Sequence, residues 1–402
     1  MNWPRKDGEI FIKPTNENNL ARMFSSGDIK DDFLKYSRGY KLSADLLIRY
    51  VIKTEKISKL DTYFFQIVYL YRQSIELIMK AIFFDKNEDS EKRETFLHDT
   101  RHELLSIWDE ISSDLEQRYN KNERLLEWVY INIENIAGFD KHSDVFRYPN
   151  TKDLELFFKE EKRYNLRNIA ENMNCLFEFF ENFINDNFFN DLNEVISREP
   201  LVFVEGGSYY EFSHIGWNYD AEYHYHTYIK GYKECANILV DRALESENKD
   251  FNNKIIFPIC FLYRNLLELL LKNILINYSS LEIAEIKKGL NRKKHSLIGL
   301  WNLIKDDIKD VPHDEEDKTL KYVEKYIEEF HQKDVRSDKF RYPIDFNIQK
   351  YFDSSEEIDV KNLSLCLKEL ICFFDGVTQA LMHRKELRQE IMRDYRPFNG
   401  NY

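Results

Sequence analysis

The chain has 402 residues, a net charge of −13 and a pI near 5.4, and 43% of its residues are hydrophobic. This hydrophobic share excludes global disorder, and 12 glycines with 8 prolines are too few for the many turns of an all-β fold. The acidic balance argues against a protein that coats nucleic acid over its whole surface, although it permits a local basic cleft.

The remaining composition indicates the compartment. The five cysteines form no CxxC pair, which favours reduced thiols in the cytoplasm. No apolar stretch approaches the roughly 18 residues that a membrane helix needs, and the N-terminus has no apolar signal core. No His, Cys or carboxylate cluster has the spacing of metal ligands. We therefore expect a cytoplasmic protein with no membrane segment, no metal and no cofactor.

The first half of the chain predicts one short strand and five helices. Glu9–Lys13 alternates in polarity as a strand does. Thr62–Asp85 is apolar on almost every face, which is typical of a helix surrounded by other helices. The charged stretch DKNEDSEKRE that follows it is interpreted as a linker. The other predicted helices cover Asp31–Lys53, His102–Gln117, Asn122–Ile136 and Tyr164–Ile184.

The second half repeats this order. Leu201–Glu205 is predicted as a strand, and Gly206-Gly207 suits the turn of a β-hairpin. Helices are predicted at Glu222–Leu244, Lys254–Tyr278, His295–Ile308, Asp317–Gln332 and Val360–Asp394, with Pro258 in the first turn of the second of these, where proline is tolerated. We therefore expect a mostly all-α fold, made of two four- or five-helix bundles with a short β-hairpin element.

An internal duplication relates the two halves. GYKLSADLLIRY from Gly39 returns as GYKECANILVDR from Gly231, at an offset of 192, and YLYRQSIELIMK returns as FLYRNLLELLLK at the same offset. HELLSIW returns as HSLIGLW at 193, and SDVFRYP returns as SDKFRYP at 194. Chance similarity between helices would not keep the order and spacing of these blocks. We place the boundary near residue 190, which gives repeats of 1–190 and 191–402, related by an approximate two-fold axis.

A repeated stripe of charges lies on the apolar second helix of each half. Arg72, Glu76 and Lys80 follow at steps of four residues, and Arg264, Glu268 and Lys272 repeat them. Buried charges need partners, and the nearby repeated candidates are Asp140, Asp144 and Arg147, with Asp334, Asp338 and Arg341 in the second copy. One interpretation is an internal ion-pair network that clamps the FRYP turn onto the central helix. The other is a pocket whose Arg and Lys residues hold a phosphate.

Two histidines occupy equivalent positions at helix starts. His102 and His295 each precede a tryptophan by six residues. A neutral imidazole there can cap the helix or pack against it. Because histidine titrates near neutrality, the other interpretation is general acid–base catalysis.

Together, LYRxxxELxxK, HxLxxLW and SDxFRYP resemble the HEPN class of small helical domains (higher eukaryotes and prokaryotes nucleotide-binding), over most of the chain. The resemblance implies helical bundles that pair face to face, and a place in a prokaryotic toxin–antitoxin, CRISPR-associated or anti-phage system. Active members of the class are metal-independent ribonucleases with an Arg-x4-6-His motif at the dimer interface. Here the internal duplication implies that one chain carries both partners of the pair.

The sequence departs from the catalytic pattern of the class. Only Arg93 and His98 fit Arg-x4-6-His, and the second half has Asn291 in place of the histidine. We do not assign catalysis to this pair. A ribonuclease would use His102 and His295 with Arg147 and Arg341, in which histidine activates the 2′-OH and arginine stabilises the phosphorane.

Two hypotheses of function remain open. The first is a HEPN-type protein of a bacterial defence or toxin–antitoxin system that binds or cleaves RNA or a nucleotide at a cleft between the repeats. The alternative is a non-catalytic helical module that binds a protein partner of the same defence system or senses a ligand. Both permit further oligomerisation, and the sequence names neither substrate nor trigger.

Overall fold

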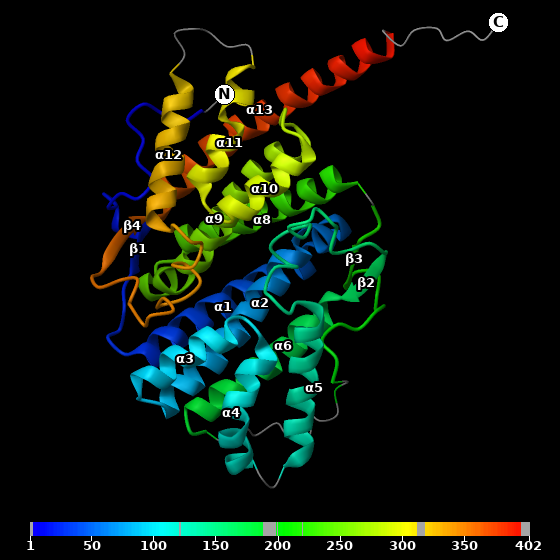
Figure 1. Ribbon diagram of the computed structural model, residues 1–402. Coiled ribbons are helices and arrows are strands. Elements are labelled where there is room, and N and C mark those ends of the chain that lie inside the picture. Colours follow the sequence, from blue (N-terminus) through cyan, green and yellow to red (C-terminus); the bar gives the residue numbers. More distant parts are fainter. Residues whose placement is uncertain are drawn as a thin grey trace, which may run out of the picture. The chain divides into compact units, whose positions relative to one another are not determined.

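The computed structural model describes residues 3–119, 122–187, 198, 200–218, 220–311 and 318–394. Most of them are helical, as predicted (Figure 1). Contacts divide the chain into two compact units. The larger unit comprises Ile12–Leu266 and Arg336–Lys361, and the smaller comprises Met1–Phe11, Leu267–Val335 and Asn362–Tyr402. The repeat boundary near residue 190 is a property of the sequence duplication and stays a prediction.

The larger unit is built around two long helices, α1 (Ile29–Thr54) and α2 (Ile57–Lys86), which lie side by side (Figure 1). Asp28 caps α1 by accepting a bond from the Asp31 N–H, at 3.0 Å. α2 is buried from Leu60 to Phe84 with one exception at its start, Asp61, because α1, α6 and α8 cover it. As predicted, α2 is apolar on almost every face because other helices surround it.

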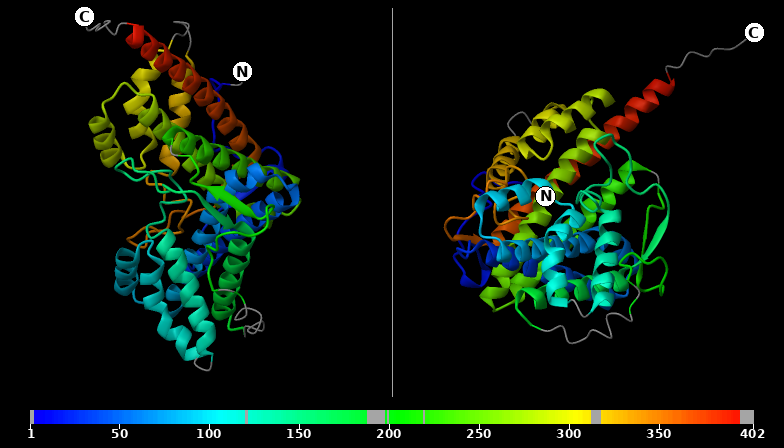
Figure 2. Two further views of the ribbon diagram at one scale, coloured as in Figure 1. Left: turned by 90° about the vertical axis from the view of Figure 1, so that its right-hand side faces the viewer. Right: turned by 60° about the horizontal axis from the view of Figure 1, so that its bottom comes forward.

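Further helices of this unit pack onto that pair. α3 (Ser90–Thr100) contacts α4 (Leu104–Tyr119), and α4 lies beside α5 (Glu123–Phe139) (Figure 2). α6 (Leu166–Ile184) and α8 (Ala221–Glu245) contact both α1 and α2. α9 (Lys249–Asn277) begins in this unit and ends in the smaller one. The predicted linker DKNEDSEKRE is wrong from Ser90 on, because Asp89 caps a helix there by accepting from the Lys92 N–H.

The β structure of the described ranges consists of two small antiparallel sheets in the larger unit, and a short 3-10 helix (Glu17–Asn19) precedes the first strand. β1 (Leu20–Met23) pairs with β4 (Glu356–Asp359), and β2 (Lys162–Asn165) pairs with β3 (Phe212–Ile215). The predicted strand at 9–13 is wrong, since the N–H groups of Ile10 and Phe11 bond to the Glu329 carboxylate. The predicted hairpin at Gly206-Gly207 is also wrong, because residues 204–206 bond to β2 instead.

The smaller unit contains four helices in the described part of the chain, besides the end of α9. They are α10 (Ile283–Lys293), α11 (Leu297–Lys309), α12 (Thr319–Lys333) and α13 (Val360–Asp394), whose first two residues belong to the larger unit. α11 contacts α10 and α12, and the rings of Trp301 and Phe374 meet edge-on between α11 and α13. None of the described helices is long and apolar enough to cross a membrane.

Two glycines of the repeated GYK blocks permit close approaches between helices of the larger unit. A methyl group on Gly39 of α1 would lie 2.1 Å from the carbonyl oxygen of Lys254 on α9. Pro258, inside α9, has no N–H to donate to that carbonyl. A methyl group on Gly231 of α8 would lie 2.3 Å from the carbonyl oxygen of Thr62 on α2. The first helix of each sequence repeat therefore meets the second helix of the other.

Candidate functional site: buried charges around two FRYP turns

The charged stripe of α2 is an internal ion-pair network. Arg72, Glu76 and Lys80 are at most 3% exposed. Glu76 accepts hydrogen bonds from the Arg72 guanidinium and, at 2.9 Å, from Lys80 Nζ. Arg72 also lies 3.7 Å from Asp140. The predicted pairing of Glu76 with Arg72 and Lys80 is confirmed, and each of these three charges has an opposite charge beside it.

His102 and Tyr342 complete this network. His102 lies in the turn between α3 and α4, two residues before α4 begins, and its Nδ1 is 3.1 Å from Glu76 Oε1. Tyr342 Oη donates to the same carboxylate oxygen at 2.8 Å and lies 2.7 Å from His102 Nδ1. The Lys80 ammonium sits 4.8 Å from the centre of the Tyr342 ring. The four side chains of Glu76, Lys80, His102 and Tyr342 form what we call the Glu76 cluster.

Burial sets the protonation states in the Glu76 cluster. Burial lowers the pKa of His102 to about 4, although the Glu76 carboxylate partly opposes that shift, so the imidazole is neutral at pH 7. Burial alone would raise the pKa of Glu76, but Lys80 and Arg72 outweigh it and hold this pKa well below its usual range. Burial, and then the negative Glu76, raise the pKa of Tyr342. The cluster therefore holds one carboxylate, one ammonium and two neutral rings.

A small cavity lies beside the Glu76 cluster. It is lined by Lys80, His102, Tyr342 and the two carboxylates of Asp338 and Asp345, with apolar and aromatic residues from α1, α3 and the segment after the second FRYP motif. Its volume of about 20 Å³ suits one water molecule. About a quarter of the His102 side chain, 24%, is exposed. His102 is therefore the residue of the cluster through which a ligand would first meet it.

The two SDxFRYP motifs form the same buried turn. Ser143 and Ser337 both have positive φ, at 61° and 66°. Arg147 Nε donates to the carbonyl oxygen of Ser143 and its Nη2 binds Asp144 at 2.7 Å. In the second motif, Arg341 makes the equivalent bonds to Ser337 and Asp338, both at 2.6 Å. Each aspartate thus binds the guanidinium of the arginine three residues after it.

Each turn is anchored by helices of the other sequence repeat. Gln73, next to Arg72 on α2, donates to the Arg341 carbonyl at 3.3 Å, and Asn265 on α9 donates to the Arg147 carbonyl at 3.1 Å. Four tyrosine hydroxyls make further crossed bonds to backbone carbonyls of the two turns. On α1, Tyr36 donates to Lys339 and Tyr40 donates to Phe340; on α8, Tyr228 donates to Val145 and Tyr232 donates to Phe146. The interpretation that the FRYP turn is clamped onto the central helix of its own half holds for one contact of the first turn: Asp140, which accepts from the N–H groups of Asp144 and Val145, lies 3.7 Å from Arg72. The bonds to the carbonyls of both turns are crossed instead.

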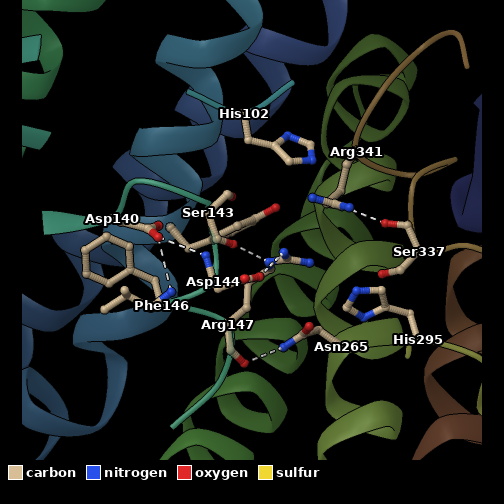
Figure 3. A network of polar contacts seen from close by, with 12 residues as sticks. His102, Asp140, Ser143, Asp144, Phe146, Arg147, Asn265, His295, Ser337 and Arg341 are labelled. Carbon is tan, nitrogen blue, oxygen red and sulfur yellow. Dashed lines mark hydrogen bonds and ion pairs between the residues drawn. The ribbon is translucent and has the colours of Figure 1, made fainter. Parts of the chain in front are cut away.

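This crossing brings Arg147 and Arg341 together in the larger unit (Figure 3). Both side chains are 3% exposed. Burial and the positive charge of Arg341 lower the pKa of Arg147, and neighbouring acidic and phenolic groups raise it more, so that its net shift is upward. Arg341 also acts on His102, where it favours the neutral imidazole. Nη1 of each arginine is buried and has no hydrogen-bond acceptor among the residues that the structure describes.

The second charged stripe is divided between the two compact units. Arg264 is buried in the larger unit. In the smaller unit, Glu268 bonds to Lys272 at 2.7 Å and to His295 Nδ1 at 2.9 Å. The glutamate–lysine–histidine contacts thus repeat those of the Glu76 cluster, and the predicted pairing of Glu268 with Lys272 is confirmed.

The Arg93–His98 pair has a structural explanation for its arginine. Arg93 donates to the carbonyl oxygens of Phe84 and Asn87, at the end of α2. Such bonds satisfy carbonyls that a helix end leaves without an internal partner. This agrees with leaving the pair out of the catalytic assignment.

Sequence analysis missed three residues that shape the site: Tyr342, Gln73 and Asn265. A signal for them was present, because the tyrosine belongs to both FRYP motifs and an amide side chain follows the arginine in both YRQ and YRN. What the sequence did not show is which turn each amide reaches.

Within the described residues, no three His, Cys, Asp or Glu side chains gather in a way that could hold a metal ion. None of the five cysteines, all of which lie in the described ranges, forms a disulfide bond. No protein-family model, no curated protein and no solved structure matches this chain.

Proposed function

We propose that this chain is a HEPN-type protein of a bacterial defence or toxin–antitoxin system that binds RNA or a nucleotide through its phosphate. The proposed site comprises Arg147, Arg341 and His102 in the larger unit. The observation that carries the proposal is the pair of buried arginines, each with an Nη1 group that no acceptor among the described residues satisfies. A buried, unsatisfied donor costs about 1–3 kcal/mol, and guanidinium groups suit phosphate oxygens in geometry and charge.

The crossed turns support the part of the proposal that concerns the fold. Members of the HEPN class pair face to face, and here helices of one sequence repeat hold the FRYP turn of the other. We propose that the two repeats form such a pair within one chain. The equivalent bonds at Gln73 and Asn265, and the equivalent contacts at Gly39 and Gly231, are the relationship that a two-fold axis produces.

The protonation states bear on cleavage. His102 is neutral at pH 7 and can accept a proton from a ribose 2′-OH, although a pKa of about 4 makes it a weak base. The 2′-oxygen then attacks the adjacent phosphorus and expels the 5′-oxygen, which takes its proton from water because almost no His102 is protonated at this pH. Arg341, which lies close enough to act on that imidazole, carries the charge that a phosphorane needs. Cleavage by this route uses no metal and therefore proceeds in EDTA. His295, with Glu268 and Lys272, remains the predicted second histidine.

The experiment measures binding of fluorescent single-stranded RNA and of nucleotides to the full chain in EDTA, at low and at moderate salt. We expect binding that weakens as salt rises, and a loss of about tenfold or more in affinity when Arg147 and Arg341 are both replaced by Gln. Arg163→Gln is the matched control, because Arg163 is an exposed arginine paired with Glu161. Absence of RNA and nucleotide binding at low salt contradicts the proposal, as does activity that EDTA abolishes.

A specific observation favours the alternative, a non-catalytic module that binds a protein partner. Tyr209, Tyr210 and Trp217 are 60%, 54% and 46% exposed and lie close together in the sequence around β3. Exposed Tyr and Trp are typical centres of protein interfaces. The cations nearby are paired, Lys162 with Glu205 and Arg163 with Glu161, so that little positive electrostatic potential remains at this surface to attract a nucleic acid. Under this alternative, Tyr210→Ser and Trp217→Ser abolish protection against phage, while the arginine variants keep it.

A further inference from the structure

The two FRYP arginines use two of their three nitrogen atoms in the same way. In each, Nε donates to a serine carbonyl and Nη2 to an aspartate, and Nη1 is left over. Surveys of folded proteins show that nearly all buried donors have a partner, so an equivalent unsatisfied donor at both arginines needs an explanation. Figure 3 shows both side chains in one part of the network, with His102 beside Arg341.

The charge at this place favours an anion over a neutral ligand. Arg341 opposes the charge of Arg147, and both act on the buried Tyr69, whose pKa they lower against the effect of burial. The Tyr69 hydroxyl donates to Gln73, and its oxygen accepts no hydrogen bond from Nη1 of either arginine. An anion bound to both Nη1 groups satisfies two donors and screens the repulsion between the two charges.

The small space limits the shape of that anion. Both arginines are 3% exposed, and the neighbouring cavity beside Asp338 and His102 has a volume of about 20 Å³. A phosphodiester inside an RNA chain carries a sugar on each side, so a buried site for it needs two openings through which the chain can enter and leave. A terminal phosphate carries one substituent and presents three oxygens, so that it needs one opening and can bind two arginines together.

We propose, on the basis of the function proposed above, that Arg147 and Arg341 together bind a terminal phosphate: that of a free nucleotide or the 5′-phosphate at an RNA end. The opening lies at the cavity lined by Lys80, His102, Asp338, Asp345 and Tyr342, which has to widen beyond its volume of about 20 Å³ to admit a phosphate. Asp338 connects this cavity to the arginines, because it lines the one and binds Arg341. Internal phosphates of an RNA are excluded from the arginine pair, so that under this inference the pair binds a terminal phosphate and takes no part in cleavage by a ribose 2′-OH.

The test compares ligands that differ only in the terminal phosphate. Binding to the full chain is measured for inorganic phosphate, for AMP, and for one short RNA with either a 5′-phosphate or a 5′-hydroxyl. We expect the 5′-phosphate to strengthen binding of the RNA, or AMP to bind with competition from inorganic phosphate, in either case with at least about a tenfold preference over the 5′-hydroxyl RNA. Binding by AMP alone assigns the site to nucleotides, and binding by the phosphorylated RNA alone assigns it to RNA ends.

A second measurement keeps the proposal testable if arginine variants fold poorly. Inorganic phosphate should raise the Tm of the wild type at constant ionic strength, because a ligand of the folded state stabilises it. Arg147→Lys and Arg341→Lys should each reduce that shift, whereas Arg163→Gln should keep it. Equal binding of the 5′-hydroxyl and 5′-phosphate RNAs, without competition by phosphate, overturns this inference and leaves the proposed function standing. No binding of any of these ligands overturns both.

Discussion

The hydroxyl of Tyr342 donates a 2.8 Å hydrogen bond to the carboxylate of Glu76, 266 positions earlier in the sequence. The same carboxylate oxygen lies 2.9 Å from Lys80 Nζ and 3.1 Å from His102 Nδ1. Glu76 is fully buried, so these contacts replace the water that a carboxylate loses on burial. The second FRYP motif is therefore part of the environment that keeps Glu76 charged.

Tyr342→Phe removes one of these donors and changes little else. We expect a loss of about 1.5–3 kcal/mol in the free energy of unfolding, the usual range for a hydrogen bond to a charged group. Urea denaturation of both proteins measures it. Tyr209→Phe is the control, because Tyr209 is 60% exposed and its variant should stay within about 0.5 kcal/mol of the wild type. A Tyr342→Phe protein as stable as the wild type would show that Glu76 does not depend on this bond.

Stability should depend on pH through His102. In the folded chain its pKa is about 4, against about 6.5 in an unfolded chain. Between these values the unfolded state binds the extra proton and the folded state does not, so the stabilisation is complete above pH 6.5 and is lost as the pH falls toward 4. The loss is at most about 3 kcal/mol, and less because part of the ring meets solvent.

His102→Gln isolates this contribution. The difference in unfolding free energy between pH 7 and pH 5 should be smaller in the variant than in the wild type. The groups facing the imidazole are Glu76, Tyr342, Lys80 and Arg341. None of these has an ordinary unfolded-state pKa between 5 and 7, so they do not mask the comparison. Identical pH dependence in the two proteins would contradict the prediction.

Gly39→Ala and Gly231→Ala should both destabilise the fold. In each, the added methyl group would lie 2.1–2.3 Å from a carbonyl oxygen of a facing helix, so that helices must separate, at a cost of about 1–3 kcal/mol or more. Gly138→Ala in α5 is the matched control: nothing lies within 4 Å of its new methyl group, and alanine favours a helix over glycine by about 1 kcal/mol. In thermal denaturation, the Tm should therefore fall for Gly39→Ala and Gly231→Ala and rise for Gly138→Ala.

Gln73→Leu and Asn265→Leu test the crossed anchoring of the turns. Each change leaves the buried carbonyl of an arginine in the opposite sequence repeat without its amide donor. We expect each to cost about 1–3 kcal/mol of unfolding free energy. Asn182→Leu serves as the control, since the Asn182 amide donates to the Glu178 carbonyl of its own helix in an exposed bond. If both core variants matched this control in chemical denaturation, the amide bonds would contribute nothing to the anchoring.

The long helices could be predicted because their apolar residues recur at helical spacing, and α2 and α6 are examples. Two helices, α3 and α10, were missed because they are short and rich in charge, with only Phe96, Leu97 and Thr100 buried in α3. The helix predicted from Lys254 begins at Lys249, so that Pro258 lies inside it and not in its first turn. A proline indicates the start of a helix only when nothing else stabilises helix in the turn before it. Here that turn packs against Gly39 of α1, and the helix runs through Pro258.

The crossed partners could not be predicted from local patterns. A stripe of Arg, Glu and Lys at steps of four predicts that charges share a helix face, and that prediction for Glu76 holds. It does not say which of two identical FRYP motifs lies against that face. Proximity in sequence favoured Arg147 and Asp144, whereas the backbone places Tyr342 and the Arg341 carbonyl there. Duplicated sequences leave this choice open because each copy presents the same chemistry.

The crossing also bears on how the protein is made. A ribosome completes α2 long before it reaches Tyr342, 266 residues after Glu76, so the nascent chain holds Glu76, Lys80 and His102 without their last partner. Contacts this distant in sequence form late and slow folding, and the exposed surface can meet the FRYP turn of another nascent chain first. Nascent chains on neighbouring ribosomes of one message would therefore compete with the chain's own C-terminal repeat. Slow translation of the second half prolongs this exposure and should increase the share of oligomers that exchange repeats.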